Sequence, residues 1–207
     1  MKTRMVPTPF PQIQQHVIQK LQDGLASHLT YHSVAHTLDV LDRAEAIAIA
    51  EKVKSPRELL LLKVAVLYHD AGFIETYQNH EKKSCEIAGQ ELPAFGFNPQ
   101  EIDTICHLIM ATKLPQSPQT KLEQVICDAD LDYLGRDDYS PIAHRLYQEL
   151  LALDILQTEE QWIQMQVNFL EKHRYFTRHC HQNREAHKQA NLQNLKVKTG
   201  QLQKTGA

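Results

Sequence analysis

The pattern of apolar and polar positions predicts a chain built from helices. Apolar residues recur three or four positions apart, the spacing of one helix face, in the segments Ile13–Leu29 and Val34–Val53. The segment Leu59–Leu67 contains one polar residue, Lys63, and therefore predicts a helix that is buried on most sides. Because no useful length of the chain alternates apolar and polar residues, the pattern predicts an all-α fold.

Capping residues mark where several of these helices start. A cap residue followed by proline, with glutamate three residues on, occurs as SPRE at 55–58 and as NPQE at 98–101. Ser33 is a further cap residue, and Gly72 is expected to end the buried helix in a left-handed conformation. The approximate bounds of the expected helices are 13–29, 33–53, 55–70, 79–92, 98–111, 121–133, 140–153, 158–173 and 178–197.

Composition and charge narrow the function classes. The 207 residues carry a net charge of −3, which gives no overall attraction to nucleic acid, and no apolar run approaches membrane-spanning length. The first residues lack the apolar core of a secretory signal. Four cysteines lie far apart in the sequence: Cys85, Cys106, Cys127 and Cys180. We interpret them as thiols of a reducing compartment, with disulfides as the less favoured alternative, and expect a cytoplasmic protein.

Histidines and aspartates on three predicted helices form the candidate site. His32 and His36 are four residues apart, so both can project from one helix face. His69 and Asp70 end the buried helix, where an ionised carboxylate is costly unless it is paired or binds a metal. Asp130 lies in another apolar helix and is expected to face inward. Two imidazoles and two carboxylates suit Mn²⁺, Fe²⁺, Ni²⁺, Zn²⁺ or Mg²⁺ and leave positions open for water and substrate.

In their order along the chain, three motifs resemble the HD-domain metal-dependent phosphohydrolase superfamily. They are YHSVAHT at 31–37, HDAG at 69–72 and DADLDYLG at 128–135. The resemblance implies a helical bundle of the HD type and the metal ligands His36, His69, Asp70 and Asp130. Asp130 is preferred to Asp128 because the family's aspartate follows an alanine and precedes a leucine. His32 matches a histidine that some members use as a proton donor to the leaving group.

The resemblance also predicts how the chain is organised. We expect a single domain over residues 1–207, with a metal-site core at about 31–135 and a C-terminal helical extension with a basic tail at about 140–207. The segment 172–204 has eight basic residues and one acidic residue, a net charge of +7. A solvated helix face is the favoured interpretation of this charge, and a positive rim that attracts anionic substrates is the alternative.

A second metal ion is the next implication of the resemblance. His80 and His107 follow the HD pair in the order of the histidines that bind a second ion in two-metal members. Two ions about 3.5–4 Å apart would hold the attacking and leaving oxygens of a phosphoryl transfer. The alternatives are that His80 is a surface residue and His107 a core residue, or that both contact phosphate or transfer protons.

The expected activity is hydrolysis of a phosphoester in a small phosphorylated metabolite or a nucleotide. Coordination lowers the pKa of a metal-activated water toward neutrality, and Asp70 or Asp130 would orient this water or take its proton. Cationic side chains should hold the phosphate, and position favours Lys83 and Arg136, each of which could instead be a plain surface charge.

Two other functions are compatible with these residues. A di-iron oxygenase of the same superfamily would use His36, His69-Asp70, His80, His107 and Asp130 as its ligand set. A non-catalytic metal-binding HD module would be expected to lack one of the four main ligands, and none is absent from the sequence. The phosphohydrolase is therefore the favoured interpretation, and the oligomeric state stays open.

Overall fold

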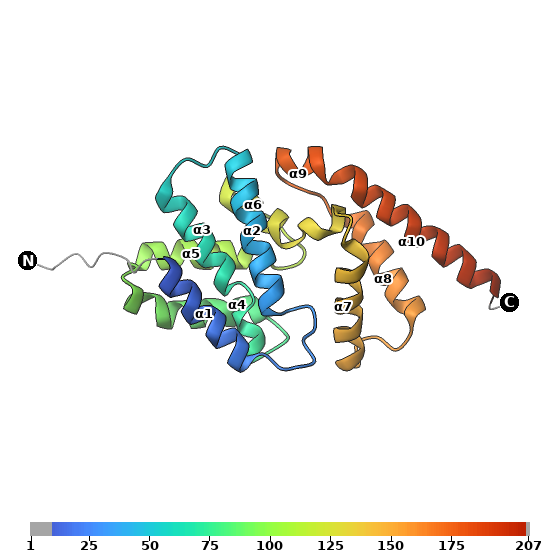
Figure 1. Ribbon diagram of the computed structural model, residues 1–207, viewed down its shortest axis with the longest axis horizontal. Helices are drawn as coiled ribbons and strands as arrows, with labels where there is room; N and C mark the ends of the chain where they lie inside the picture. The colour runs from blue at the N-terminus through green and yellow to red at the C-terminus, as the bar shows by residue number, and fades with distance from the viewer. Residues whose placement is uncertain (1–9, 206–207) are drawn as a thin grey trace, which may run out of the picture. The chain divides into compact units, whose positions relative to one another are not determined.

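The computed structural model describes residues 10–205, and the side chains of residues 10–200, as a set of helices (Figure 1). No strand occurs in this part of the chain, which confirms the predicted all-α fold. The α-helices are α1 (Phe10–Gly24), α2 (Val34–Ala50), α3 (Pro56–Tyr68), α4 (His80–Glu91), α5 (Pro99–Ala111), α6 (Lys121–Asp130), α7 (Tyr139–Ala152), α8 (Glu159–Lys172), α9 (Arg178–Asn183) and α10 (Glu185–Thr205). The short 3-10 helices are η1 (Ala71–Ile74), η2 (Leu92–Phe95) and η3 (Asp132–Gly135).

The chain divides into two compact units. The first contains residues 10–26 together with His32–Asp130, and therefore α1 to α6. The second contains Ser27–Tyr31 and residues 131–205, and therefore α7 to α10. Every residue predicted from the sequence to bind a metal lies in the first unit.

Helix α3 is the centre of the first unit, because it packs against α1, α2, α4, α5 and α6. From Leu61 to Tyr68 every residue except Lys63 is buried, which confirms the buried helix predicted from the sequence. Lys63 keeps its charge at the edge of the core, where it pairs with Glu45 and lies 4.0 Å from the centroid of the Phe10 ring. Each buried leucine or valine contributes about 1.5–3 kcal/mol to the stability of this core.

The predicted caps are present at the starts of three helices. Ser33 Oγ accepts a hydrogen bond from the backbone N–H of His36, and Ser55 caps α3 in the same way. Asn98 and Glu101 form a reciprocal capping box at the start of α5. Each cap satisfies a backbone N–H that has no partner within its own helix, so these starts are set locally.

Two helices differ most from their predicted bounds. Helix α1 ends at Gly24 rather than at about residue 29. The helix predicted over 178–197 is divided into α9 and α10, and Arg184 between them has a non-helical φ of −121°. The Arg184 side chain donates from Nε to Asp132 Oδ1 at 2.7 Å, and a Cβ on Gly135 would lie 2.3 Å from the Arg184 carbonyl oxygen. These close contacts hold the chain at the break.

Gly72 was predicted to adopt a left-handed conformation, and this prediction was wrong. Helix α3 already ends at Tyr68, and Gly72 lies within η1 without a positive φ. The structure requires glycine there for a different reason, because an added Cβ would lie 2.0 Å from the carbonyl oxygen of His80. The missing side chain therefore lets the first residue of α4 pack directly against η1.

The second unit is held by the packing of α10 against α8 and η3. Leu192 and Leu195 of α10 are buried, and so is Lys188 on the same face. The Lys188 ammonium donates to the carbonyl oxygen of His173 at 2.9 Å and lies 2.9 Å from a carboxylate oxygen of Glu185. Lys188 therefore does not belong to the solvated basic face that the sequence predicted.

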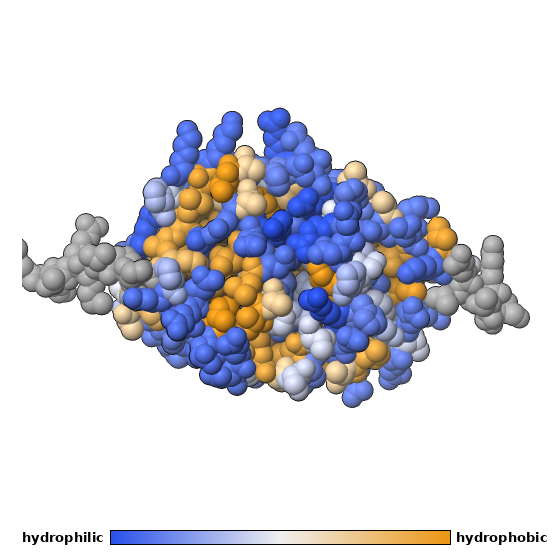
Figure 2. Space-filling model, viewed as in Figure 1, coloured by the Kyte–Doolittle hydropathy of each residue, from blue (hydrophilic) through white to orange (hydrophobic). Residues whose placement is uncertain are grey.

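The surface mixes polar and apolar residues, as the face drawn in Figure 2 shows. Among the described side chains, the large apolar ones that are exposed lie at scattered positions: Leu38, Ile49, Met110, Leu114, Ile155, Met165 and Val197. None of the described helices has both the length and the apolar character needed to cross a membrane.

Candidate metal centre

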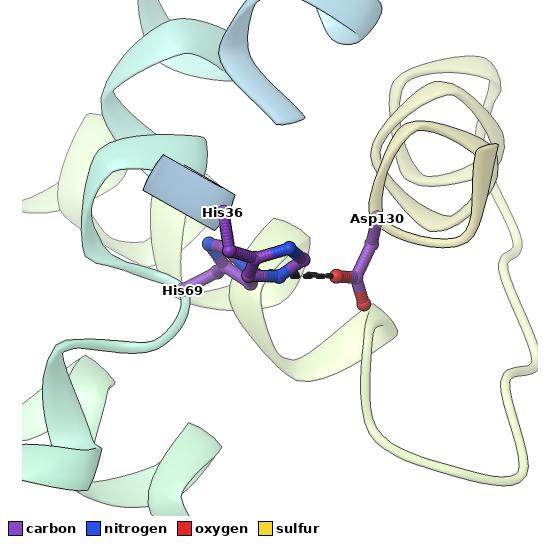
Figure 3. Close-up of side chains that lie close together, drawn as sticks. All are labelled: His36, His69 and Asp130. Atoms are coloured by element: carbon purple, nitrogen blue, oxygen red, sulfur yellow. Dashed lines mark hydrogen bonds and ion pairs between the residues drawn. The ribbon is translucent and has the colours of Figure 1, made fainter. Parts of the chain in front are cut away.

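Three side chains from different elements converge in the first unit. His36 lies in the first turn of α2, His69 directly follows α3, and Asp130 is the last residue of α6. One ligand atom from each lies within 4.8 Å of the other two, and Figure 3 shows the three side chains pointing toward one another. Asp130 Oδ1 lies 3.2 Å from His36 Nε2 and 3.5 Å from His69 Nε2. The structure thus brings Asp130 to the group.

Asp70 faces the same two imidazoles. Its Oδ2 lies 3.4 Å from His36 Nε2 and 3.2 Å from His69 Nε2. This oxygen is buried and accepts no hydrogen bond from the part of the chain that the structure describes. A buried carboxylate oxygen without a hydrogen bond is costly, and a cation shared with the two imidazoles would satisfy it.

Local contacts orient the two histidine rings. Nδ1 of His69 lies 2.7 Å from the Val66 carbonyl oxygen, which can only accept, so Nδ1 carries the proton and Nε2 faces the cluster. His36 is placed by the start of α2, where the Ser33 cap fixes the direction of the first turn. An imidazole whose far nitrogen donates to a carbonyl is oriented as metal-ligating histidines usually are.

Ser84 in α4 anchors the HD segment, which is the HDAG motif at residues 69–72. Its hydroxyl donates to the His69 carbonyl oxygen at 2.7 Å and accepts from the Gly72 backbone N–H at 2.8 Å. The side chain is fully buried, so it holds the backbone on both sides of Asp70. Ser84 could not be recognised from the sequence, because a single serine within a helix carries no distinguishing pattern.

The carboxylates and imidazoles of the cluster stabilise each other's charged forms. Burial alone would lower the pKa of His36, but the carboxylates of Asp130 and Asp70 outweigh this effect and raise it to about 9. The pKa of His69 is raised against burial by the same two carboxylates. Burial would raise the pKa of Asp130, and hydrogen bonds from the two imidazoles lower it to about 2. The carboxylates therefore favour positive charge between them, whether it is carried by protons or by a divalent cation.

Two further histidines lie beside Asp70 and share one aromatic neighbour, which no sequence motif includes. The His32 and His80 rings both stack on Phe73, with centroids 4.0 and 3.9 Å away. His80 Nε2 lies 3.6 Å from Asp70 Oδ1 and 3.6 Å from Glu81 Oε1. The structure therefore brings His80 to the cluster through Asp70. Phe73 directly follows the HDAG motif, which is the one signal that could have drawn attention to it.

The structure does not bring His107 to this group. Its ring lies on the exposed face of α5, where Nδ1 is 3.5 Å from Asp103 Oδ2. On the same helix Ile105, Leu108 and Ile109 face the core, so helical geometry directs residue 107 outward.

The two predicted phosphate-binding cations have carboxylate partners. Lys83 is half-buried, and its ammonium lies 2.8 Å from Glu75 and 3.2 Å from Glu86. Arg136 belongs to the second unit, where its guanidinium makes two hydrogen bonds to Asp138, of 2.8 and 2.9 Å. A role in holding phosphate stays a prediction for both residues.

The first unit is thus an all-α structure with a buried cluster of two imidazoles and two carboxylates, a donor set that suits a divalent metal ion. The family model of the HD domain matches residues 34–132, a range that includes His36, His69, Asp70 and Asp130. Residues 34–132 are therefore an HD domain, which confirms the resemblance found in the motifs. HD domains are mostly metal-dependent hydrolases. No curated protein and no solved structure matches the chain.

Proposed function

We propose that this protein is a metal-dependent phosphohydrolase that cleaves a phosphoester of a small phosphorylated metabolite or a nucleotide. The observation that carries the proposal is the convergence of His36, His69 and Asp130, together with the buried Oδ2 of Asp70, which lies within 3.4 Å of both imidazoles. Phosphoryl transfer depends on stabilising negative charge at transferring oxygens, which a divalent cation in this cluster would do. We place the protein in the cytoplasm, a reducing compartment in keeping with its four free thiols.

We assign one divalent ion to His36, His69, Asp70 and Asp130. When bound, such an ion polarises a phosphoryl oxygen and lowers the pKa of a water toward neutrality. The Asp70 carboxylate faces two ways, since Oδ2 faces the imidazoles of His36 and His69 while Oδ1 faces His80. Asp70 can therefore contribute one oxygen to the ion and use the other to orient the attacking water or accept its proton.

His32 is the proposed proton donor to the leaving oxygen. Its ring stacks on Phe73 and lies 6.1 Å, centroid to centroid, from the ring of His36. This position puts an imidazole next to the cluster without making it one of the converging atoms. A positioned imidazole is the commonest general acid near neutral pH.

His80 supports a second cation on the other side of Asp70. Its Nδ1 lies 3.3 Å from the Tyr77 carbonyl oxygen and so carries the proton, which leaves Nε2 facing the carboxylates of Asp70 and Glu81. Burial lowers the pKa of His80, so its ring is expected to be neutral at physiological pH. A lone pair beside two carboxylate oxygens is an arrangement that a cation would stabilise, and this favours a two-ion site that uses His80 without His107.

The oxygenase alternative has less support. Its ligand set would include His107, whose ring lies on the exposed face of α5 next to Asp103. The proposed hydrolytic site does not use His107 as a ligand. We therefore prefer hydrolysis to oxygen-dependent cleavage.

The test is phosphate release by the metal-depleted full-length protein after addition of Mn²⁺, Fe²⁺, Ni²⁺, Zn²⁺ or Mg²⁺. A panel of phosphorylated metabolites and nucleotides serves as substrates, with oxygen consumption recorded in parallel. We expect at least one ion to restore turnover of at least one substrate without oxygen uptake. Oxygen uptake with an iron-loaded sample, or no metal-dependent release from any substrate, would contradict the proposal.

A matched pair of histidine variants provides the control. His69→Ala removes an imidazole from the cluster and should reduce turnover by at least about 100-fold, because the ion loses a direct ligand. His107→Ala makes the same change at the exposed position and should leave turnover within about twofold. Equal effects of the two substitutions would show that the cluster is not the active site.

A further inference from the structure

Two of the four cysteines face each other across neighbouring helices. The sulfur of Cys85 in α4 lies 3.5 Å from the carbonyl oxygen of Cys106 in α5, and the sulfur of Cys106 lies 3.8 Å from the carbonyl oxygen of Cys85. Both side chains are half-buried, whereas Cys127 and Cys180 are buried. The two facing residues are 21 positions apart, and no local sequence pattern marks them as neighbours.

The reciprocal contacts bring the two thiols toward each other between α4 and α5. Each thiol points at the backbone of the other residue, so the two sulfurs share one gap between α4 and α5. A disulfide requires Cα atoms closer than about 7 Å and side chains that converge. The two sulfur–carbonyl contacts supply the convergence, and α4 packs directly against α5.

We propose that Cys85 and Cys106 are a redox-active pair that forms a reversible intramolecular disulfide by exchange with a low-molecular-weight disulfide of the glutathione type. This modification site is independent of the proposed hydrolytic function. Cys127 is not part of it, because its thiol is buried and donates to the Ala111 carbonyl oxygen at 3.0 Å.

The exchange takes place in two steps. In the first, one cysteine thiolate attacks a sulfur of the small disulfide, whose S–S bond breaks and releases one small thiolate. In the second, the other cysteine thiolate attacks the protein sulfur of the mixed disulfide. This step forms the bond between Cys85 and Cys106 and releases the second small thiolate. The two protein thiols are oxidised, the small disulfide is reduced to two thiols, and the protons of the cysteines end on these thiols.

The order of attack follows from the interaction of the two thiols across this gap. The interaction lowers the pKa of Cys106 and, together with burial, raises the pKa of Cys85. The negative charges of Glu81 and Glu86 raise the pKa of Cys85 further. Cys106 is therefore expected to form the mixed disulfide and Cys85 to resolve it.

The position of the pair links it to the HD segment. Cys85 directly follows Ser84, whose hydroxyl bonds both the His69 carbonyl and the Gly72 N–H. A disulfide at Cys85 would tie this anchoring helix covalently to α5. Oxidation is therefore expected to stabilise the first unit, because the cross-link shortens the unfolded chain between α4 and α5.

Thiol mapping of the native full-length protein tests the proposal. The protein is equilibrated with graded ratios of oxidised to reduced glutathione, alkylated, digested without reduction and examined by mass spectrometry. We expect two of the four thiols to disappear together, one cross-linked peptide that contains Cys85 and Cys106, and recovery of both thiols with dithiothreitol. The thermal midpoint should rise by roughly 5–10 °C on oxidation, as a closed loop of this length predicts.

Three variants sharpen the test. Cys85→Ser and Cys106→Ser should each abolish the cross-link, whereas Cys180→Ala in the second unit should leave it intact. Mixed glutathione disulfides alone, disulfides between molecules alone, or a cross-link that forms only in denaturant would each overturn the proposal. The mapping of the unaltered chain decides the outcome even if a cysteine variant does not fold.

Discussion

At the scale of single residues, Asp70 combines burial, negative charge and an oxygen that accepts no hydrogen bond from the described chain. Asp70→Asn keeps the shape of the side chain and removes its charge. We expect the affinity for Mn²⁺ to fall by more than about 100-fold, since losing a residue that only orients a ligand already costs about 10–100-fold. Isothermal titration calorimetry measures this loss. His107→Ala is the control, and an Asp70→Asn protein with unchanged affinity would remove Asp70 from the site.

The pKa of His36 makes the stability of the metal-free protein depend on pH. The folded pKa of about 9 is above the ordinary value of 6.5, so this group stabilises the fold fully below about pH 6.5 and loses that effect as the pH rises through 9. For Asp130 the folded pKa of about 2 is below 3.8, so its contribution is present above pH 3.8 and disappears as the pH falls through 2. We expect greatest stability between these limits, at about pH 4–6.5.

Urea unfolding of metal-depleted protein at a series of pH values checks this expectation. The stability of wild-type protein should decrease between pH 7 and 10, and His36→Gln should make this decrease smaller. Affinity for a metal ion should change in the opposite direction and increase over the same range, because a bound ion requires neutral imidazoles. A wild-type stability that increases from pH 7 to 10 would contradict the proposed pairing of His36 with the carboxylates.

The convergence of the cluster side chains could be predicted from the sequence, and the residues that support them could not. His36, His69, Asp70 and Asp130 are set by motif order. Ser84, like Phe73, acts through contacts made only when α4 packs against η1, so no local pattern reveals it. His107 was predicted from order alone, although the buried positions on either side of it in α5 already place it on the outer face.

At the scale of elements, the contact between η1 and α4 holds the HD segment in place. Gly72→Ala would place a Cβ 2.0 Å from the carbonyl oxygen of His80, a backbone atom that can move only with α4. We expect a loss of about 2–4 kcal/mol in the free energy of unfolding and weaker metal binding, because the shift also displaces Ser84. Denaturant unfolding and metal titration measure the two effects.

Gly89→Ala is the matched control for this substitution. Gly89 lies within α4, and an added Cβ there meets nothing within 4 Å. The same change should therefore stabilise the protein by about 0.5–1 kcal/mol, the usual gain of alanine over glycine inside a helix. A Gly72→Ala protein as stable as Gly89→Ala would show that the contact between η1 and α4 is not close.

Element bounds were predictable where a local signal sets them. The starts at Ser33, Ser55 and Asn98 are fixed by caps that bond within one turn, so sequence reasoning located them. The break at Arg184 depends on a hydrogen bond to Asp132, 52 residues away. Such a contact exists only after the second unit has folded, and apolar spacing cannot reveal it.

At the scale of the whole molecule, the division into units was outside the reach of sequence patterns. Apolar periodicity identifies an all-α chain because it describes each helix separately. Ser27–Tyr31 belongs to the second unit because the Tyr31 N–H donates at 3.0 Å to Glu149 Oε2, 118 residues further along. The sequence around neither residue indicates that contact.

The division predicts where a bound ion changes hydrogen exchange. All four assigned ligands lie in the first unit, so an ion that binds only the folded state should stabilise that unit by RT ln(1 + [L]/Kd), about 100-fold in its opening equilibrium at 100 times Kd. We expect amides of α2, α3 and α6 to exchange about 100-fold more slowly with saturating Mn²⁺, and those of α8 and α10 to be unchanged. Mass spectrometry of exchanged peptides measures both sets, and Asp70→Asn should abolish the slowing. Equal slowing in α10 would mean that the two units open together, and no slowing in α3 would mean that the ion binds elsewhere.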